Sequence, residues 1–216
     1  MLLTMESPNL DRLRELLTPF VAEAPAGEFD ACMLHCVQTH LDLLLRWNQR
    51  MNLTGLREAE EMVARHFGES LFAAQHLLSR DSQEEVFDVG SGAGFPGLPL
   101  KYWAPEIRMT LIEGHGKKAT FLREVGRALQ LNGFTVLNSR AEDVTAKVPL
   151  VTMRAVEKFE RALPTAARLV APGGRLGLLI GLAQRERALE LLGAGKSSAI
   201  VLPGAEQRIL LTWHAK

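Results

Sequence analysis

The sequence predicts an α/β fold, packed as one compact unit, in which a helical extension over residues 1–80 precedes a mostly parallel sheet over residues 81–216. Three observations support this prediction. Apolar residues recur at helical spacing through the first 80 residues, where no stretch has the composition of a strand. Short apolar runs then alternate with helical patterns, which is typical of a parallel sheet with helices on both faces. The last two runs are separated by a short turn and can pair only as an antiparallel hairpin.

The extension divides into four helical segments. These cover residues 7–17, 28–48, 58–66 and 69–78. Ser7 is the expected N-cap of the first helix, Pro8 its first residue, and Pro19 is expected to break it. The last two segments lie on either side of a break expected around residues 66–68.

In the second part, strands and helices alternate before the terminal hairpin. Strands are expected at residues 85–89, 108–113, 134–138, 149–153 and 174–180. Helical patterns cover residues 97–103, 117–130, 158–170 and 183–192, with a short turn near 142–146. The hairpin strands, 198–202 and 208–213, flank a turn at 203–205. A parallel sheet that ends in an antiparallel hairpin is the layout of class I methyltransferases.

Charge and composition set the broad class. Lys plus Arg and Asp plus Glu both count 25, so the net charge is zero and any contact with nucleic acid must use a local basic patch. The candidates for such a patch are Arg46, Arg50, Arg57, Arg65, Lys117, Lys118, Arg123 and Arg127. No apolar run has the length of a membrane span, no signal peptide is expected, and two cysteines indicate a reducing compartment. We therefore expect a cytoplasmic protein without membrane contact.

Residues 85–100, EVFDVGSGAGFPGLPL, place a glycine turn between a strand and a helix. Glycine permits positive φ and close approach of a ligand, and the following helix presents free N–H groups. Residues 92–97 fit the pattern G-x-G-x-x-G, which alone leaves both NAD and S-adenosylmethionine open. Glu113, at the end of the second strand, suits the ribose diol of either ligand. Asp88 favours S-adenosylmethionine because it can receive an ammonium group that a dinucleotide lacks there, and the terminal hairpin favours the same donor.

The chain resembles the bacterial 16S ribosomal RNA guanine-N7 methyltransferase family, RsmG, also called GidB. The matching motifs are Trp47-Asn48 with Asn52-Leu53-Thr54, Arg65-His66, residues 88–97, Leu111-Ile112-Glu113, Lys117-Lys118 with Phe121-Leu122, residues 139–142, and Arg154-Ala155-Val156. The resemblance covers nearly the whole chain. It implies methyl transfer from S-adenosylmethionine to 16S ribosomal RNA or the small ribosomal subunit, by a protein expected to act as a monomer.

The resemblance also implies roles for individual residues. The methionine end of the donor is expected against Asp88, Gly90, Ser91, Gly92, Gly94 and Phe95. Glu113 is expected to hold the ribose, and Ala141 and Glu142 are expected to meet the adenine. The transfer site is expected to include Arg154, which also borders the donor, and His66. Arg123 is expected to lie close to this site or to RNA phosphate.

Three positions depart from the family pattern. Glu69 stands where an Asp is usual, Pro149 where an acid usually precedes the fourth strand, and Ile180 where a Lys usually precedes Gly181. A small-molecule methyltransferase and a donor-binding protein without catalysis therefore stay open as alternatives. We expect no metal site.

The helix face that carries Cys32, Cys36 and His40 has the residue types of a metal site. These side chains are spread over two turns and cannot easily reach one ion, so packing is the favoured interpretation.

Overall fold

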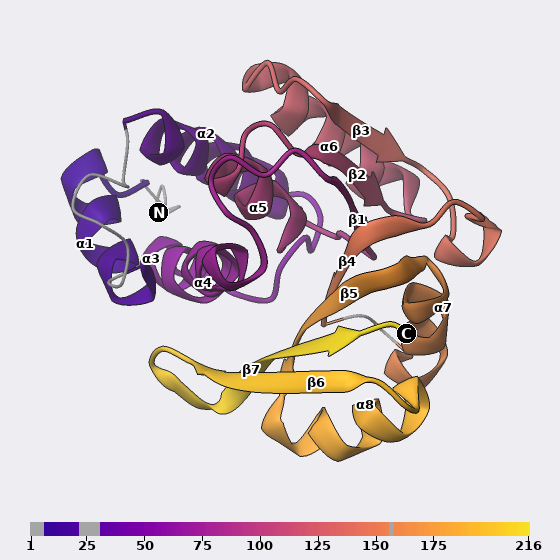
Figure 1. The fold of residues 1–216 in the computed structure, drawn as a ribbon. Helices are drawn as coiled ribbons and strands as arrows, with labels where there is room; N and C mark the ends of the chain where they lie inside the picture. The colour runs from indigo at the N-terminus through magenta and orange to yellow at the C-terminus, as the bar shows by residue number, and fades with distance from the viewer. Residues whose placement is uncertain (1–6, 22–30, 156–157) are drawn as a thin grey trace.

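The computed structural model describes residues 7–21, 31–155 and 158–216. A seven-stranded sheet with the order β3-β2-β1-β4-β5-β7-β6 forms the centre of the molecule. The extension, α5 and α6 share one hydrophobic core on one face of the sheet, and α7 and α8 share a second core on the other (Figure 1). Within the described residues, no helix has both the length and the hydrophobicity needed to span a membrane.

The strands confirm the predicted layout. They are β1 (Glu85–Val89), β2 (Arg108–Ile112), β3 (Phe134–Leu137), β4 (Val148–Arg154), β5 (Val170–Gly181), β6 (Lys196–Leu202) and β7 (Ala205–His214). The pairs among β1 to β5 are parallel, whereas β7 pairs antiparallel with both β5 and β6. The helices between them are α5 (Gly97–Trp103), α6 (Gly116–Ala128), η2 (Ala141–Asp143), α7 (Phe159–Arg168), η3 (Leu182–Gln184) and α8 (Arg185–Leu192).

The helical extension departs from prediction at its first helix. The described elements are α1 (Leu10–Val21), α2 (Ala31–Asn48), α3 (Ala59–Met62), η1 (Val63–Gly68) and α4 (Glu69–Leu77). Asn9, not Ser7, caps α1, because its side-chain oxygen accepts the N–H of Arg12 at 2.9 Å. Pro19 lies inside α1 instead of ending it, since Phe20 and Val21 are buried and hold the last turn in place. The predicted start of the second helix, at residues 28–30, lies outside the described residues.

The break predicted at residues 66–68 is also wrong. The chain stays helical from Ala59 to Leu77 and widens to a π-helical segment, η1, in the middle. Gly68 is needed for packing, because a Cβ there would lie 2.5 Å from the ring of Phe20. A glycine that looks like a helix stop in the sequence is therefore a point of close helix–helix approach.

The order of the strands decides where a site can form. β1 pairs with β2 on one side and with β4 on the other, so the chain leaves β1 at the point where the strand order reverses. In open α/β sheets, ligands bind outside the carboxyl ends of the strands at this point. Gly90, Glu113 and Arg154 follow or end these three strands and consequently meet at one edge of the sheet.

Candidate active site

The glycine turn after β1 is shaped by backbone torsions that favour glycine. Gly90, Gly92 and Gly94 have φ of 68°, 56° and 94°. The N–H of Gly90 donates to the carbonyl of Ile112 at 2.9 Å, which folds the turn back over the end of β2. The turn then leads directly into α5, whose first residue is Gly97.

Glu113 ties this turn to the loop after β2. One carboxylate oxygen accepts the N–H of Gly92 at 2.8 Å, and the other accepts the N–H of His115 at 2.7 Å. The residue is 7% exposed. Each oxygen keeps a further lone pair, so the carboxylate can still accept hydroxyl hydrogen bonds from a ribose.

Two adjoining cavities follow this edge of the sheet and share Gly90. The larger, of about 560 Å³, is lined by Leu53, Thr54, Gly55, His66, Gly90, Ser91, Gly92, Ala93, Phe95, Glu113, His115, Lys118, Arg154 and Ala155. The smaller, of about 350 Å³, is lined by Val89, Gly90, Ile112, Gly114, Ser139, Arg140, Ala141, Glu142, Lys158, Arg161, Ala162 and Thr165. We name them the transfer cavity and the adenine cavity, after the groups that the resemblance leads us to expect there. Volumes of a few hundred Å³ are those of small-molecule sites.

Asp88 and Gly94, both predicted to contact the donor, line neither cavity. Asp88 is fully buried and accepts a 2.8 Å hydrogen bond from the hydroxyl of Thr152 on β4. Burial raises the pKa of Asp88 to about 6, against the lowering effect of Thr152. A Cβ on Gly97 would lie 2.8 Å from its other oxygen. Asp88 therefore lies beneath the turn, between β4 and α5, and its contact with an ammonium group stays a prediction.

His66, on η1, reaches the transfer cavity as predicted and is held on two sides. Its Nε2 lies 2.7 Å from the hydroxyl oxygen of Thr54, and its ring stacks on Phe95 with centroids 4.8 Å apart. Burial, followed by the charges of Arg154 and Arg65, lowers the pKa of His66 to about 3. The imidazole is therefore neutral at physiological pH.

His40 supports the same stack from below, a role that sequence reasoning missed. Its ring also stacks on Phe95, with centroids 5.0 Å apart, and its Nε2–H donates to the carbonyl of Ala93 at 2.9 Å. The hydroxyl of Tyr102 donates to Nδ1 at 3.1 Å, and burial lowers the pKa of His40 to about 3. His40 therefore has a packing role, the interpretation that the sequence favoured over metal binding for this helix face.

A second residue whose role was missed is Asn48, at the end of α2. Its side-chain oxygen accepts the N–H groups of Leu53 and Thr54 at 2.9 and 3.0 Å. This pair of bonds shapes the loop that carries Thr54 to His66. The motif of Trp47-Asn48 with Asn52-Leu53-Thr54 indicated that this loop matters. Its spacing could not show that the loop contacts His66.

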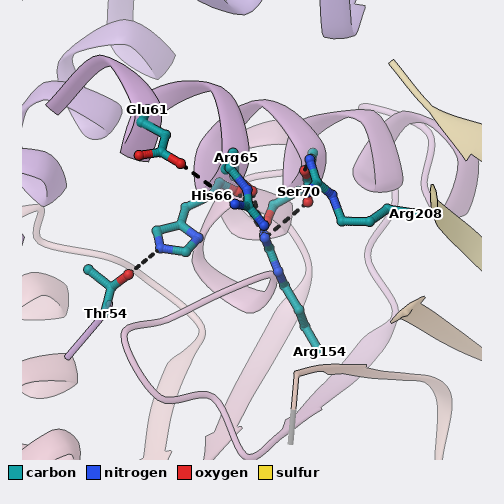
Figure 2. A network of polar contacts seen from close by, with 8 residues as sticks. Thr54, Glu61, Arg65, His66, Ser70, Arg154 and Arg208 are labelled. Atoms are coloured by element: carbon teal, nitrogen blue, oxygen red, sulfur yellow. Dashed lines mark hydrogen bonds and ion pairs between the residues drawn. The ribbon is translucent and has the colours of Figure 1, made fainter. Parts of the chain in front are cut away.

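Arg154, at the end of β4, lines the transfer cavity. Figure 2 shows its side chain pointing toward Arg65 and Ser70 of the extension. Its Nη2 donates to the carbonyl of Arg65 at 2.6 Å and to the carboxylate of Glu69 at 3.0 Å. Within the described part of the chain, its Nη1 makes only long contacts, 3.4 Å to the carbonyl of His66 and 3.5 Å to the hydroxyl of Ser70. Arg154 consequently fixes the π-helical segment that presents His66.

The structure does not bring Arg123 to the transfer cavity, so of its two expected positions only the one at RNA phosphate stays a prediction. Its guanidinium is exposed and donates to the carbonyl of Val136 on β3 at 3.4 Å. The reason is the helical phase of α6, which turns Phe121 and Leu122 into the core and Arg123 toward the edge of the sheet.

The three departures from the family pattern have distinct structural settings. Pro149 lies near the start of β4, at a register shift far along the strand from Arg154, where proline is tolerated. Glu69 is buried and lies between two arginines, Arg154 at 3.0 Å and Arg208 at 2.7 Å. Ile180 is buried, and the strand pair next to it places Arg208 opposite Gly181.

The predicted basic patch is only partly assembled. Lys118 lines the transfer cavity, whereas Arg46, Arg50 and Lys117 line a separate cavity of about 470 Å³. Trp47 also lines that second cavity; its ring packs edge-on against Phe121 and its N–H donates to Glu124 at 3.0 Å. The main role of Trp47 is therefore to join α2 to α6.

The fold and the site together define a class I S-adenosylmethionine-dependent methyltransferase. Among solved structures, a ribosomal protein L11 methylase from Lactobacillus delbrueckii subsp. bulgaricus matches with a TM-score of 0.58 and 13% identity, over 71% of this chain and 80% of that one. TYW2 from M. jannaschii, solved in complex with AdoMet, matches with a TM-score of 0.52 and 18% identity, over 69% and 74%. At these identities the similarity concerns the fold.

The chain belongs to the GidB family, the rRNA small subunit methyltransferases G. The family model matches residues 33–201. Ribosomal RNA small subunit methyltransferase G of Chloroflexus aggregans is 41% identical over 189 residues, which cover 81% of this chain and 78% of that protein.

Proposed function

We propose that this protein transfers the methyl group of S-adenosylmethionine to N7 of a guanine in 16S ribosomal RNA. The observation that carries the proposal is the transfer cavity, where the glycine turn and Glu113 face His66 and Arg154. Its membership of the rRNA small subunit methyltransferase G family supports the choice of substrate. A ribosomal substrate supports a cytoplasmic location, and we propose that the protein acts as a monomer.

The residues present fit the methyl donor. Glu113 has free lone pairs toward the cavity for the ribose hydroxyls, and the turn at Gly90 and Gly92 leaves the backbone open to the methionine end. Ala141 and Glu142 line the adenine cavity, where the base fits. When bound, the donor supplies a sulfonium-activated methyl group.

The chemistry needs alignment more than proton transfer. Guanine N7 has an available lone pair and no proton, so no general base is required. A neutral His66, whose pKa is lowered to about 3, suits this role because it packs beside the reacting groups without exchanging a proton. The stacked rings of His66 and Phe95 also help to exclude water from the cavity.

Arg154 contributes at the substrate end. A bidentate contact from arginine to O6 and N7 of guanine would cover the nucleophile. Nη2 of Arg154 is already committed to Arg65 and Glu69, so Nη1 is the nitrogen left to turn toward O6. A single contact of this kind would orient the base and leave N7 free.

The experiment uses donor labelled with tritium in the methyl group. The protein is incubated with total ribosomal RNA, with small subunits and with a metabolite extract, and borohydride–aniline cleavage then locates 7-methylguanosine in the labelled RNA. We expect label at one guanine of 16S ribosomal RNA. Label in metabolites alone would contradict the proposal and indicate a small-molecule substrate, and donor binding without transfer would indicate a non-catalytic protein.

A further inference from the structure

A fourth cavity, behind Arg154, has no part in the chemistry described above. It measures about 170 Å³ and is lined by Arg65, Glu69, Arg154, Ala155, Phe159, Leu179, Ile180, Gly181, Gln184, Leu202 and Arg208. Arg154 and Ala155 also line the transfer cavity, so the two spaces adjoin. The volume lies below the roughly 300–1,000 Å³ of drug-sized ligand sites, which indicates a small group and not a nucleoside.

Among the residues that the structure describes, the charges around this cavity do not balance. Glu69 is the one carboxylate in the described lining, and it is shared by Arg154 at 3.0 Å and Arg208 at 2.7 Å. The side chains of Glu69 and Arg154 are 2% and 11% exposed, so this pair is buried, whereas Arg208 is 33% exposed. Arg65 adds a third guanidinium, which is 41% exposed and pairs with the exposed Glu61 at 3.6 Å. A partly buried charge without a full counter-charge carries a desolvation cost, and a bound anion would lower that cost.

Unused hydrogen-bond donors accompany the excess charge. The Nε–H groups of Arg65 and Arg208 are buried and find no acceptor within the described residues. Buried donors are nearly always paired in folded proteins, so two orphans on one cavity point to an acceptor supplied from outside. Gln184 adds an amide: its oxygen accepts the N–H of Gly181 at 3.0 Å, which leaves its NH₂ group as a donor.

We infer that this cavity, with Arg208 as its main contact, binds a phosphate group of the RNA strand next to the target guanosine. The inference rests on the proposed function. Guanidinium groups match the geometry of phosphate oxygens and pair with them in bidentate fashion. Arg208 is suited to the role because its side chain is one-third exposed, whereas Arg154 is buried and committed. Arg154 then separates the phosphate from the base and sets the distance between them.

The test compares Arg208→Gln and Arg208→Lys with Arg108→Gln. Arg108 is an exposed arginine that pairs with Glu85 at 3.4 Å, at the opposite edge of the sheet, and is the matched control. For Arg208→Gln we expect KM for RNA to rise about tenfold or more, with kcat and donor affinity within about twofold of wild type. The slope of log KM against log salt should fall by about one, as for the loss of one phosphate contact. Arg208→Lys should recover part of the affinity, and Arg108→Gln should behave as wild type.

A second measurement needs no variant of the protein. RNA substrates carry a neutral methylphosphonate at one linkage at a time on either side of the target guanosine. For the wild type, we expect one linkage to raise KM by the same factor as Arg208→Gln. At that linkage Arg208→Gln should show no further loss.

The outcomes separate this inference from the proposed function. If the wild type methylates RNA but Arg208→Gln leaves KM and the salt slope unchanged, only the phosphate site is refuted. A second outcome is that Arg208→Gln lowers both thermal stability and kcat, while a methylphosphonate has the same effect on KM at every linkage. Arg208 is then a structural ion-pair partner and the inference is wrong. If the wild type methylates no RNA, the proposed function is refuted and the phosphate site with it.

Discussion

The two walls of the transfer cavity are built by different means. The donor wall is held by main-chain groups close in sequence, because Glu113 accepts the N–H groups of Gly92 and His115, 21 and 2 residues away. The opposite wall is held by side chains distant in sequence: Arg154 reaches Glu69 across 85 residues, and Glu69 reaches Arg208 on β7. The donor wall can therefore form from one motif, whereas the other wall needs the extension, the sheet and the hairpin together.

This difference implies that substitutions in the two walls should have different effects. A change on the donor wall should weaken donor binding and leave the fold intact, because few long-range contacts depend on it. A change at Arg154 or Thr54, which hold His66 and its segment in the opposite wall, should cost stability and transfer while sparing the donor. The predictions below test this division, beginning with the largest expected effect.

Arg154→Met should produce the largest loss. It removes the partner of buried Glu69 and frees the carbonyl of Arg65, so the free energy of unfolding should fall by about 3–5 kcal/mol. Methyl transfer should fall on the order of 100-fold as His66 loses its position, with donor affinity within about twofold of wild type. Urea unfolding, a transfer assay and calorimetry measure the three quantities.

The matched control is Arg175→Met. Arg175 is a half-buried arginine paired with Glu84 away from the cavity. It should lose stability but keep both donor affinity and transfer per folded molecule. Loss of donor binding in Arg154→Met beyond that in Arg175→Met would contradict the division between the walls.

Glu113→Ala should have the complementary effect. It removes the acceptor for the ribose and releases the N–H groups of Gly92 and His115, so donor affinity should fall about 100-fold. Calorimetric titration with S-adenosylmethionine measures the change. Glu85→Ala, at the opposite end of β1, is the control and should bind the donor normally. An unchanged affinity in Glu113→Ala would show that the ribose lies elsewhere.

Lowering the pH from 7 to 5 should destabilise the protein through the stack that joins the walls. His40 and His66 have pKa values of about 3 in the folded protein, against an ordinary 6.5. Over this pH range the unfolded chain binds protons at these two histidines and the folded protein does not. The free energy of unfolding therefore falls by about 2 kcal/mol for each histidine. Asp88 acts in the opposite direction, because its pKa is raised from 3.8 to about 6. As the pH falls, Asp88 binds a proton in the folded protein before it does so in the unfolded chain. This raises the free energy of unfolding by about 1 kcal/mol over the same range.

Urea unfolding at pH 7 and pH 5 measures the net loss. His40→Gln should remove about half of the histidine contribution, because one of the two buried imidazoles is gone. His76→Gln, at an exposed position, should keep the full loss. A stability that stays constant or rises at pH 5 would refute the assignment of neutral, buried imidazoles.

The same division explains what could be predicted from the sequence. The strand at residues 85–89 and the meeting of the glycine turn with Glu113 follow from local composition and from the rule that parallel strands end at one edge. The Glu69–Arg208 contact, the stack of His40 on Phe95 and the outward direction of Arg123 do not. They depend on helix phase and on pairings between distant segments, which composition and spacing leave undetermined. Pro19 and Gly68 misled for the same reason, since tertiary packing overrode their usual effect on a helix.

The smallest expected effect tests whether the opposite wall needs its orientation as well as its bulk. Thr54→Val keeps the shape of the side chain but removes the hydroxyl that lies 2.7 Å from Nε2 of His66 and accepts the N–H of Leu56 at 3.2 Å. Stability should fall by about 1 kcal/mol, and kcat should fall several-fold because the ring of His66 is no longer fixed on that side. Donor affinity should not change, since the hydrogen bonds of Thr54 within the described residues go to Asn48, Leu56 and His66 and none to the glycine turn or Glu113. Thr120→Val, which removes an exposed hydroxyl bonded only within α6, is the control for the substitution itself. If kcat stays at the wild-type value while stability falls, stacking on Phe95 alone orients His66, and the loop shaped by Asn48 serves the fold and not the transfer site.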